Sequence, residues 1–164
     1  MSKTAIITGA NKGIGLAVAK NLIEKDYQII LACRDKIKGK MAEDFLGSNT
    51  TFLELDLSRP SSISQFVNQI NSDYSEIDVL YNNAGLIYRD FELTEEGYES
   101  MFSVNYFGAY RLALMLLENL HRRYGFLMCS DAPEKRTRKS TTSVKISFSI
   151  NECEELFVHM TYTK

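Results

Sequence analysis

A short apolar strand at residues 3–8 leads into a glycine-rich turn, which reads Thr8-Gly9-Ala10-Asn11-Lys12-Gly13-Ile14-Gly15. The apolar pattern that follows predicts a helix over about 14–24. Such a turn exposes backbone N–H groups at a helix N-terminus, where the helix dipole favours an anion, and glycine lets the backbone approach a phosphate closely. Many glycine-rich loops bind no ligand, but this one predicts a nucleotide-binding turn made of Gly9, Asn11, Lys12, Gly13, Ile14 and Gly15.

Strand and helix signals alternate along the chain. Strands are expected over 3–8, 27–33, 51–57, 77–81 and 125–129, and helices over 14–24, 36–46, a segment starting near Pro60, and 95–122. Repeated strand–helix–strand units predict an α/β fold, a Rossmann-like doubly wound parallel sheet in three α/β/α layers. We expect one domain over residues 1–164, with a core at 1–130 and an irregular excursion at 131–164.

Composition excludes several function classes. The net charge is −2, which gives no basic field for nucleic acid, and the basic run at 135–139 is interpreted as a solvated face. No apolar run reaches the roughly 18 residues of a membrane span. No signal peptide is expected ahead of the first strand. The three cysteines have no metal-ligand spacing, which favours reduced thiols, a cytoplasmic location and no metal site.

The end of the second strand bears on the choice of cofactor. In dinucleotide folds an acidic residue there binds the ribose hydroxyls of NAD, whereas an arginine accommodates the 2′-phosphate of NADP. Here the strand ends at Cys33 and Arg34 follows, with Lys12 in the glycine turn as a second cation. The pair favours NADP over NAD. Two alternatives stay open: Arg34 pairs with a surface acid while Lys12 is merely exposed, or Asp35 contacts the ribose.

Polar residues also follow the third and fourth strands. Asp56 stands where it can accept a hydrogen bond from an adenine amino group, or else cap the next helix. Asn82-Asn83-Ala84-Gly85 lies at the carboxyl end of the fourth strand, the edge at which such sheets bind ligands. Alone, that tetrapeptide is also compatible with a plain turn.

Taken in order, these motifs resemble the short-chain dehydrogenase/reductase family. The matching segments are Thr8 to Gly15, Asp56-Leu57, Asn82 to Gly85 and Val104-Asn105-Tyr106-Phe107-Gly108. The segment Ala32-Cys33-Arg34-Asp35 most resembles the branch of the retinol dehydrogenases and the WW-domain oxidoreductase, which generally prefers NADP and acts on carbonyl or alcohol substrates. The resemblance implies that Asp56, Leu57, Asn83, Ala84 and Gly85 bind the cofactor with the glycine turn.

The resemblance also implies catalytic residues. Asn105 matches an asparagine that anchors a proton-relay water, and we expect it to be buried and to face the sheet; its alternative role is structural. Ser130 matches the serine that polarises the substrate oxygen, or else belongs to a turn or cap. Tyr162 matches the tyrosine that exchanges the substrate proton, or else is only a terminal aromatic. The family's lysine lies four residues after the tyrosine, beyond Lys164, so the chain resembles a C-terminally truncated member. The resemblance therefore implies a fold that is incomplete at the C-terminus, with strand order 3-2-1-4-5 in the remaining sheet.

Three functional hypotheses follow. The first is an NADP-dependent oxidoreductase that acts on a small carbonyl or alcohol. The second is a nucleotide-binding or regulatory module that lacks the catalytic lysine, and the third is an unstable fragment. Self-association is expected to involve the long helix or the exposed fifth strand.

Overall fold

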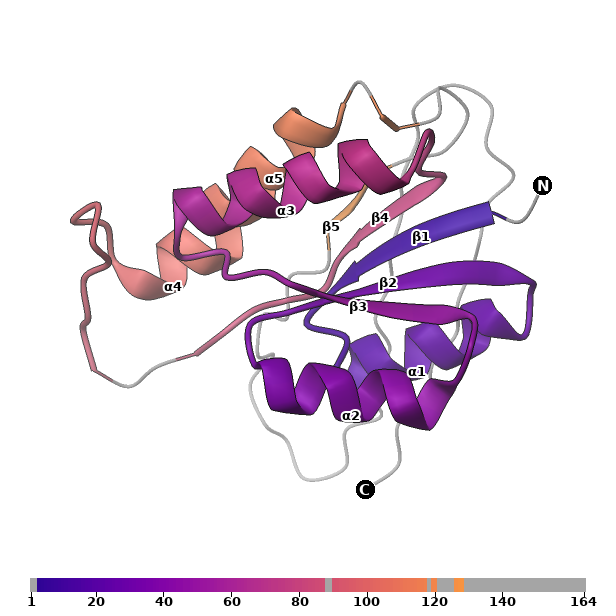
Figure 1. The fold of residues 1–164 in the computed structure, drawn as a ribbon. Coiled ribbons are helices and arrows are strands. Elements are labelled where there is room, and N and C mark those ends of the chain that lie inside the picture. The colour runs from indigo at the N-terminus through magenta and orange to yellow at the C-terminus, as the bar shows by residue number, and fades with distance from the viewer. Residues whose placement is uncertain (1–2, 88–89, 118, 121–125, 129–164) are drawn as a thin grey trace.

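The fold is a parallel sheet between two layers of helices. The computed structural model describes residues 3–87, 90–117, 119–120 and 126–128. Five strands form one parallel sheet in the order β3-β2-β1-β4-β5, as predicted (Figure 1). The strands are β1 (Lys3–Thr8), β2 (Tyr27–Cys33), β3 (Thr50–Glu54), β4 (Val79–Asn82) and β5 (Phe126–Met128).

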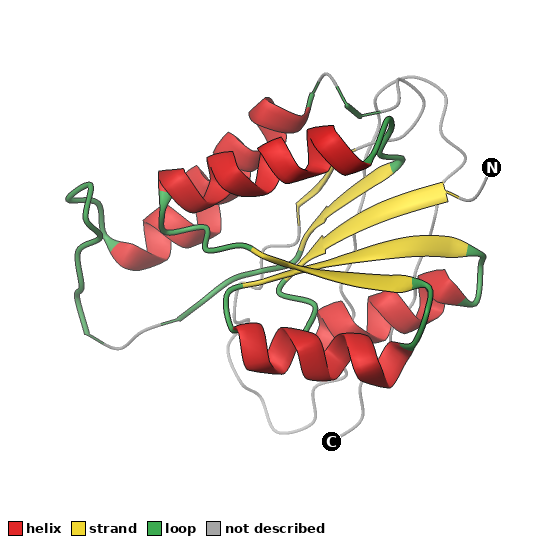
Figure 2. Ribbon diagram, in the orientation of Figure 1, coloured by secondary structure: helices red, strands yellow, loops and turns green. Residues whose placement is uncertain are grey.

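Helices cover both faces of the sheet, so the predicted doubly wound α/β fold is confirmed for the described residues (Figure 2). One face carries α1 (Gly13–Ile23) and α2 (Lys36–Leu46). The other carries α3 (Pro60–Asp73) and α5 (Ala109–Leu116), which continues α4 (Ser100–Phe102) and the π-helical segment η1 (Ser103–Gly108). The reversal of strand order beside β1 is the point at which such sheets bind ligands.

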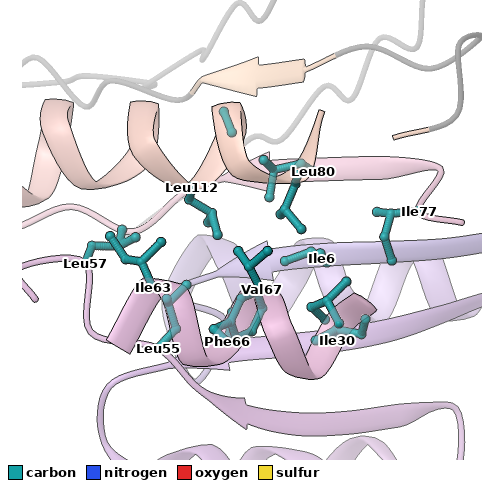
Figure 3. Packing of buried hydrophobic residues seen from close by; sticks show 14 of the residues in the cluster. Ile6, Ile30, Leu55, Leu57, Ile63, Phe66, Val67, Ile77, Leu80 and Leu112 are labelled. Atoms are coloured by element: carbon teal, nitrogen blue, oxygen red, sulfur yellow. The ribbon is translucent and has the colours of Figure 1, made fainter. Parts of the chain in front are cut away.

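Alternation along the central strands builds two separate apolar cores. Ile6 of β1 faces α3 and α5, and its neighbour Ile7 faces α1. Figure 3 shows the first core, in which Ile63, Phe66 and Val67 of α3 point toward the sheet. Because the central strands are buried on both faces, they read as nearly continuous apolar runs.

The predicted helix over 95–122 is wrong at its N-terminal end. The helical segment begins at Ser100, where both carboxylate oxygens of Glu99 accept backbone N–H groups from Met101 and Phe102. The preceding residues form a tight turn, in which Thr94 N–H donates to the Tyr98 carbonyl at 2.8 Å. Gly97 permits this turn with a φ of +79°.

Among the described strands, one end of β3 and one end of β4 differ from the predictions by more than one residue. The strand β3 ends at Glu54 rather than residue 57, because the Asp56 carboxylate turns the backbone by accepting the N–H of Ser58 at 3.0 Å. The strand β4 starts at Val79, and Ile77 ahead of it makes only an isolated bridge to Leu120. These shifts leave the strand order unchanged.

Within the described residues, no helix is long and apolar enough to cross a membrane, and no group of His, Cys, Asp and Glu side chains could hold a metal ion. The expected excursion at 131–164 lies outside the described residues.

Candidate functional site

The glycine turn joins β1 to α1 and lies against the residues that follow β4. Gly9 has a φ of +66°, and a Cβ there would lie 3.0 Å from the Cα of Ala84. A Cβ on Gly15 would lie 2.6 Å from Asn83 Nδ2 and 2.8 Å from the Gly9 carbonyl oxygen. Glycine is therefore required at both positions, because the two segments approach each other too closely for a side chain.

A hydrogen-bonded lock holds these two segments together. The Thr8 hydroxyl accepts the backbone N–H groups of Asn83 at 3.0 Å and Ala84 at 2.9 Å. In return, Asn83 Nδ2 donates to the Thr8 carbonyl at 2.9 Å and to the Gly9 carbonyl at 3.4 Å. Thr8 is almost fully buried. The glycine motif includes Thr8 without indicating this role, because the partners of its hydroxyl lie about 75 residues away in the sequence.

The first turn of α1 offers backbone donors. Lys12 is the N-cap residue in an extended conformation, and within the described part of the chain no side chain caps this helix. Asn11 is half-buried, whereas Lys12, Gly13 and Ile14 are exposed. The first N–H groups of a helix have no intrahelical acceptor, so an uncapped and exposed first turn is suited to an anion.

At the end of β2, Asp35 is the N-cap of α2. Its carboxylate accepts the Lys38 N–H at 3.0 Å and pairs with Lys38 Nζ at 3.0 Å. These hydrogen bonds from Lys38 lower the pKa of the Asp35 carboxyl. The exposed Arg34 side chain makes no ion pair with any described residue. Asp35 is therefore engaged in the helix, and Arg34 is left available to a ligand.

Cys33 lies beneath the glycine turn. Its side chain is buried, and burial raises the pKa of the thiol to about 11, although the N–H groups of Ala10 and Asn11 act in the opposite direction. The thiol is therefore neutral at physiological pH, and we assign Cys33 a packing role.

The residues that follow β3 pack against the helical segment at 103–116. The Asp56 carboxylate accepts both the N–H and the hydroxyl of Ser58, the latter at 2.6 Å, so its turn-forming role is the one that is visible. Leu57 is buried, and a Cβ on Gly108 would lie 2.2 Å from the Leu57 carbonyl oxygen. This close contact places Leu57 beside Val104, which lines a cavity of about 240 Å³ together with Arg34, Ser58 and Leu86.

Asn105 is exposed, so the expectation that it is buried was wrong. The cause is the π-helical winding of residues 103–108, which presents Ser103, Val104 and Gly108 to the interior instead. Asn105 Oδ1 accepts the Leu86 N–H at 2.8 Å, and Nδ2 donates to the Leu86 carbonyl at 2.9 Å. Asn105 thus fixes the segment that follows Gly85. The other two predicted catalytic residues, Ser130 and Tyr162, lie outside the described residues.

Asn82 is a further polar residue at this edge of the sheet that the sequence did not single out. Asn82 is buried, and in the described part of the structure both polar atoms of its amide lack a hydrogen-bond partner. The doubled asparagine of the tetrapeptide was the available signal, but nothing in the sequence distinguishes the roles of the two residues.

A parallel doubly wound sheet with a glycine-rich turn at its switch point defines the class of Rossmann-like nucleotide-binding proteins. The family model described as short chain dehydrogenase matches residues 3–128. The chain therefore belongs to the short-chain dehydrogenase family.

Relatives and solved structures agree with this assignment. The chain is 36% identical over 123 residues to mouse retinol dehydrogenase 12. The aligned region covers 72% of this chain and 39% of that protein. It is 36% identical to the chloroplastic protochlorophyllide reductase of Pisum sativum, over 80% of this chain and 33% of that protein. A 3-ketoacyl-(acyl-carrier-protein) reductase from Brucella melitensis, complexed with NADH, is similar with a TM-score of 0.62 and 26% identity, over 71% of this chain and 49% of that one. The chain thus spans well under half the length of these curated relatives.

The residues present fit the nicotinamide cofactor of this family. Around Gly13 a Cβ would meet no described atom within 4 Å, so the space beside the uncapped helix is open. The cavity of about 240 Å³ bounded by Arg34 and Val104 lies at the same edge of the sheet.

Proposed function

We propose that the chain is the cofactor-binding part of an NADP-dependent oxidoreductase for a small carbonyl or alcohol substrate. NADP would supply hydride-transfer chemistry when it is bound. The observation that carries the proposal is the glycine turn, locked to Asn83 and Ala84 beside an uncapped helix. Gly9, Asn11, Lys12, Gly13, Ile14 and Gly15 surround the pyrophosphate. Asp56, Leu57, Asn83, Ala84 and Gly85 line the path of the adenosine and ribose.

In this proposal Asn105 keeps hydrogen-bonding capacity for a relay water. Its amide has two N–H donors and two acceptor lone pairs, and Leu86 uses one of each. Ser130 polarises the substrate oxygen and Tyr162 exchanges a proton with it. A tyrosine with a pKa of about 10 needs a nearby cation to act near neutral pH, so turnover requires a lysine beyond residue 164. The proposal includes a cytoplasmic location, which an odd number of cysteines and the free, buried Cys33 favour.

The test is a calorimetric titration of the 164-residue chain with NADPH and NADH, with thermal unfolding followed in parallel. We expect tighter binding of NADPH and a raised unfolding midpoint at saturation. In Arg34→Gln the affinity for NADPH should fall about tenfold or more, because a charge-assisted hydrogen bond to the 2′-phosphate is lost, while the affinity for NADH is unchanged.

Two controls sharpen this test. Lys38→Gln removes a nearby cation that is already paired with Asp35, and should change neither affinity. Equal affinities of the wild type for NADPH and NADH would contradict the preference for NADP, and binding of neither would overturn the proposed function.

An exposed aromatic face supports the expected self-association. Phe102 stacks on Tyr106 with ring centroids 5.3 Å apart, and Tyr106 stacks on Tyr110 at 6.3 Å. These three side chains are about half exposed, and the exposed Leu114 continues the row along α5. Apolar rows of this kind mark contact surfaces. We propose a homo-oligomer through this face, and expect Tyr106→Lys to lower the sedimentation mass to that of a monomer; an unchanged mass would contradict it.

A further inference from the structure

Two arginines line the same cavity at the carboxyl edge of the sheet. Arg34 follows β2, and Arg59 is the N-cap residue of α3. Both border the cavity of about 240 Å³ that Ser58, Leu86 and Val104 also line. Lys12 is not one of the described residues that line this cavity. Arg59 is thus a further cation beside Arg34 at this cavity.

The Arg59 guanidinium forms an ion pair with Glu95, which also lines the cavity. One of its terminal nitrogens donates to Glu95 Oε1 at 3.0 Å. Glu95 belongs to the tight turn at 93–99, which a second ion pair, Arg111 with Glu96, also ties to α5 at 3.2 Å. This arrangement orients Arg59, yet both partners of the Arg59–Glu95 pair are largely exposed, so the pair is weak enough for a ligand to compete with it.

We propose that Arg59 is a second specificity-determining residue, which binds the 2′-phosphate of NADP together with Arg34; this rests on the proposed function. A phosphate carries close to two negative charges, and a single exposed guanidinium neutralises only one of them. Arg59 has N–H donors that its single hydrogen bond to Glu95 does not use, and these bind the phosphate. NAD lacks this phosphate, so Arg59 contributes to the discrimination between the two cofactors and not to the binding of the shared part.

Glu92 gives the proposal a second, opposite test, because it lines the same cavity. Its carboxylate repels a phosphate and, in a site for NAD, would instead accept hydrogen bonds from the ribose hydroxyls. Removing the charge of Glu92 should therefore strengthen the binding of NADPH if the cavity takes a phosphate, and weaken the binding of NADH if the cavity takes a ribose diol.

The experiment measures dissociation constants for NADPH and NADH in the full 164-residue chain by calorimetry. We expect Arg59→Gln to weaken NADPH binding about tenfold and to leave NADH binding within about twofold. Arg59→Lys keeps the positive charge but loses the planar guanidinium, so its affinity for NADPH should lie between those of the wild type and Arg59→Gln. Glu92→Gln should strengthen NADPH binding severalfold. The matched control is Arg111→Gln, which breaks the other ion pair of the same turn at a residue outside the cavity lining, and should alter neither constant.

The outcomes separate this inference from the proposed function. If wild type prefers NADPH and Arg59→Gln keeps the same ratio of the two constants, the role of Arg59 is overturned and the proposed function stands. An equal loss of affinity for both nucleotides in Arg59→Gln would also overturn this role, since that result would show that the ion pair with Glu95 is structural. If the wild type binds neither nucleotide, both proposals fail.

Discussion

Replacing Thr8 with valine is expected to lower the free energy of unfolding by about 1–3 kcal/mol and to abolish detectable nucleotide binding. Valine has nearly the same shape as threonine but has no hydroxyl, so the Ala84 N–H loses its acceptor and the Asn83 N–H keeps only the Tyr81 carbonyl, at 3.0 Å. An N–H that loses its partner away from water costs about 1–3 kcal/mol. The glycine turn would also lose its connection to the end of β4, and with it the fixed geometry of the phosphate site.

Thr8→Ser is the matched control for this experiment. Serine keeps the oxygen and loses only a methyl group, so it should retain nucleotide binding and remain within about 1 kcal/mol of the wild type. Urea unfolding gives the free energies, and calorimetry with NADPH gives the affinities. If valine and serine behaved alike, the hydrogen-bonded lock would not be what positions the turn.

Replacing Gly108 with alanine should destabilise the chain by about 1–3 kcal/mol, the usual range for overpacking a tight interior. The new Cβ would lie 2.2 Å from the carbonyl oxygen of Leu57 and 2.8 Å from its Cβ. Backbone atoms cannot rotate away as a flexible side chain can, so the helical segment must move away from Leu57. Since Leu57 then shifts, NADPH affinity should fall as well.

The sign of this effect is informative, because alanine is about 1 kcal/mol more favourable than glycine in a helix when nothing opposes it. The control is Gly85→Ala, whose Cβ would make an ordinary contact of 3.5 Å with Asn105 Oδ1. It should unfold close to the wild type in urea. A Gly108→Ala protein that is more stable than the wild type would contradict the close packing of this segment against Leu57.

Local patterns in the sequence determined the layers of the fold. The apolar runs at 27–33 and the helical spacing of Ile63, Phe66 and Val67 specify buried strands and a one-sided helix. The strand order 3-2-1-4-5 followed from repeated right-handed crossover units together with the resemblance. These features depend on residues close together in the chain, which is why a single sequence contains them. The glycine turn was found for the same reason.

Tertiary structure alone decided which groups meet across the sheet edge. Thr8 joins Asn83 because β1 and β4 are neighbours, and Arg59 shares a cavity with Arg34 because β2 and β3 end side by side. The exposure of Asn105 depends on π-helical winding, which apolar periodicity does not encode. Sequence spacing fixes the elements, whereas hydrogen-bond partners and shared cavities depend on distances between segments far apart in the chain.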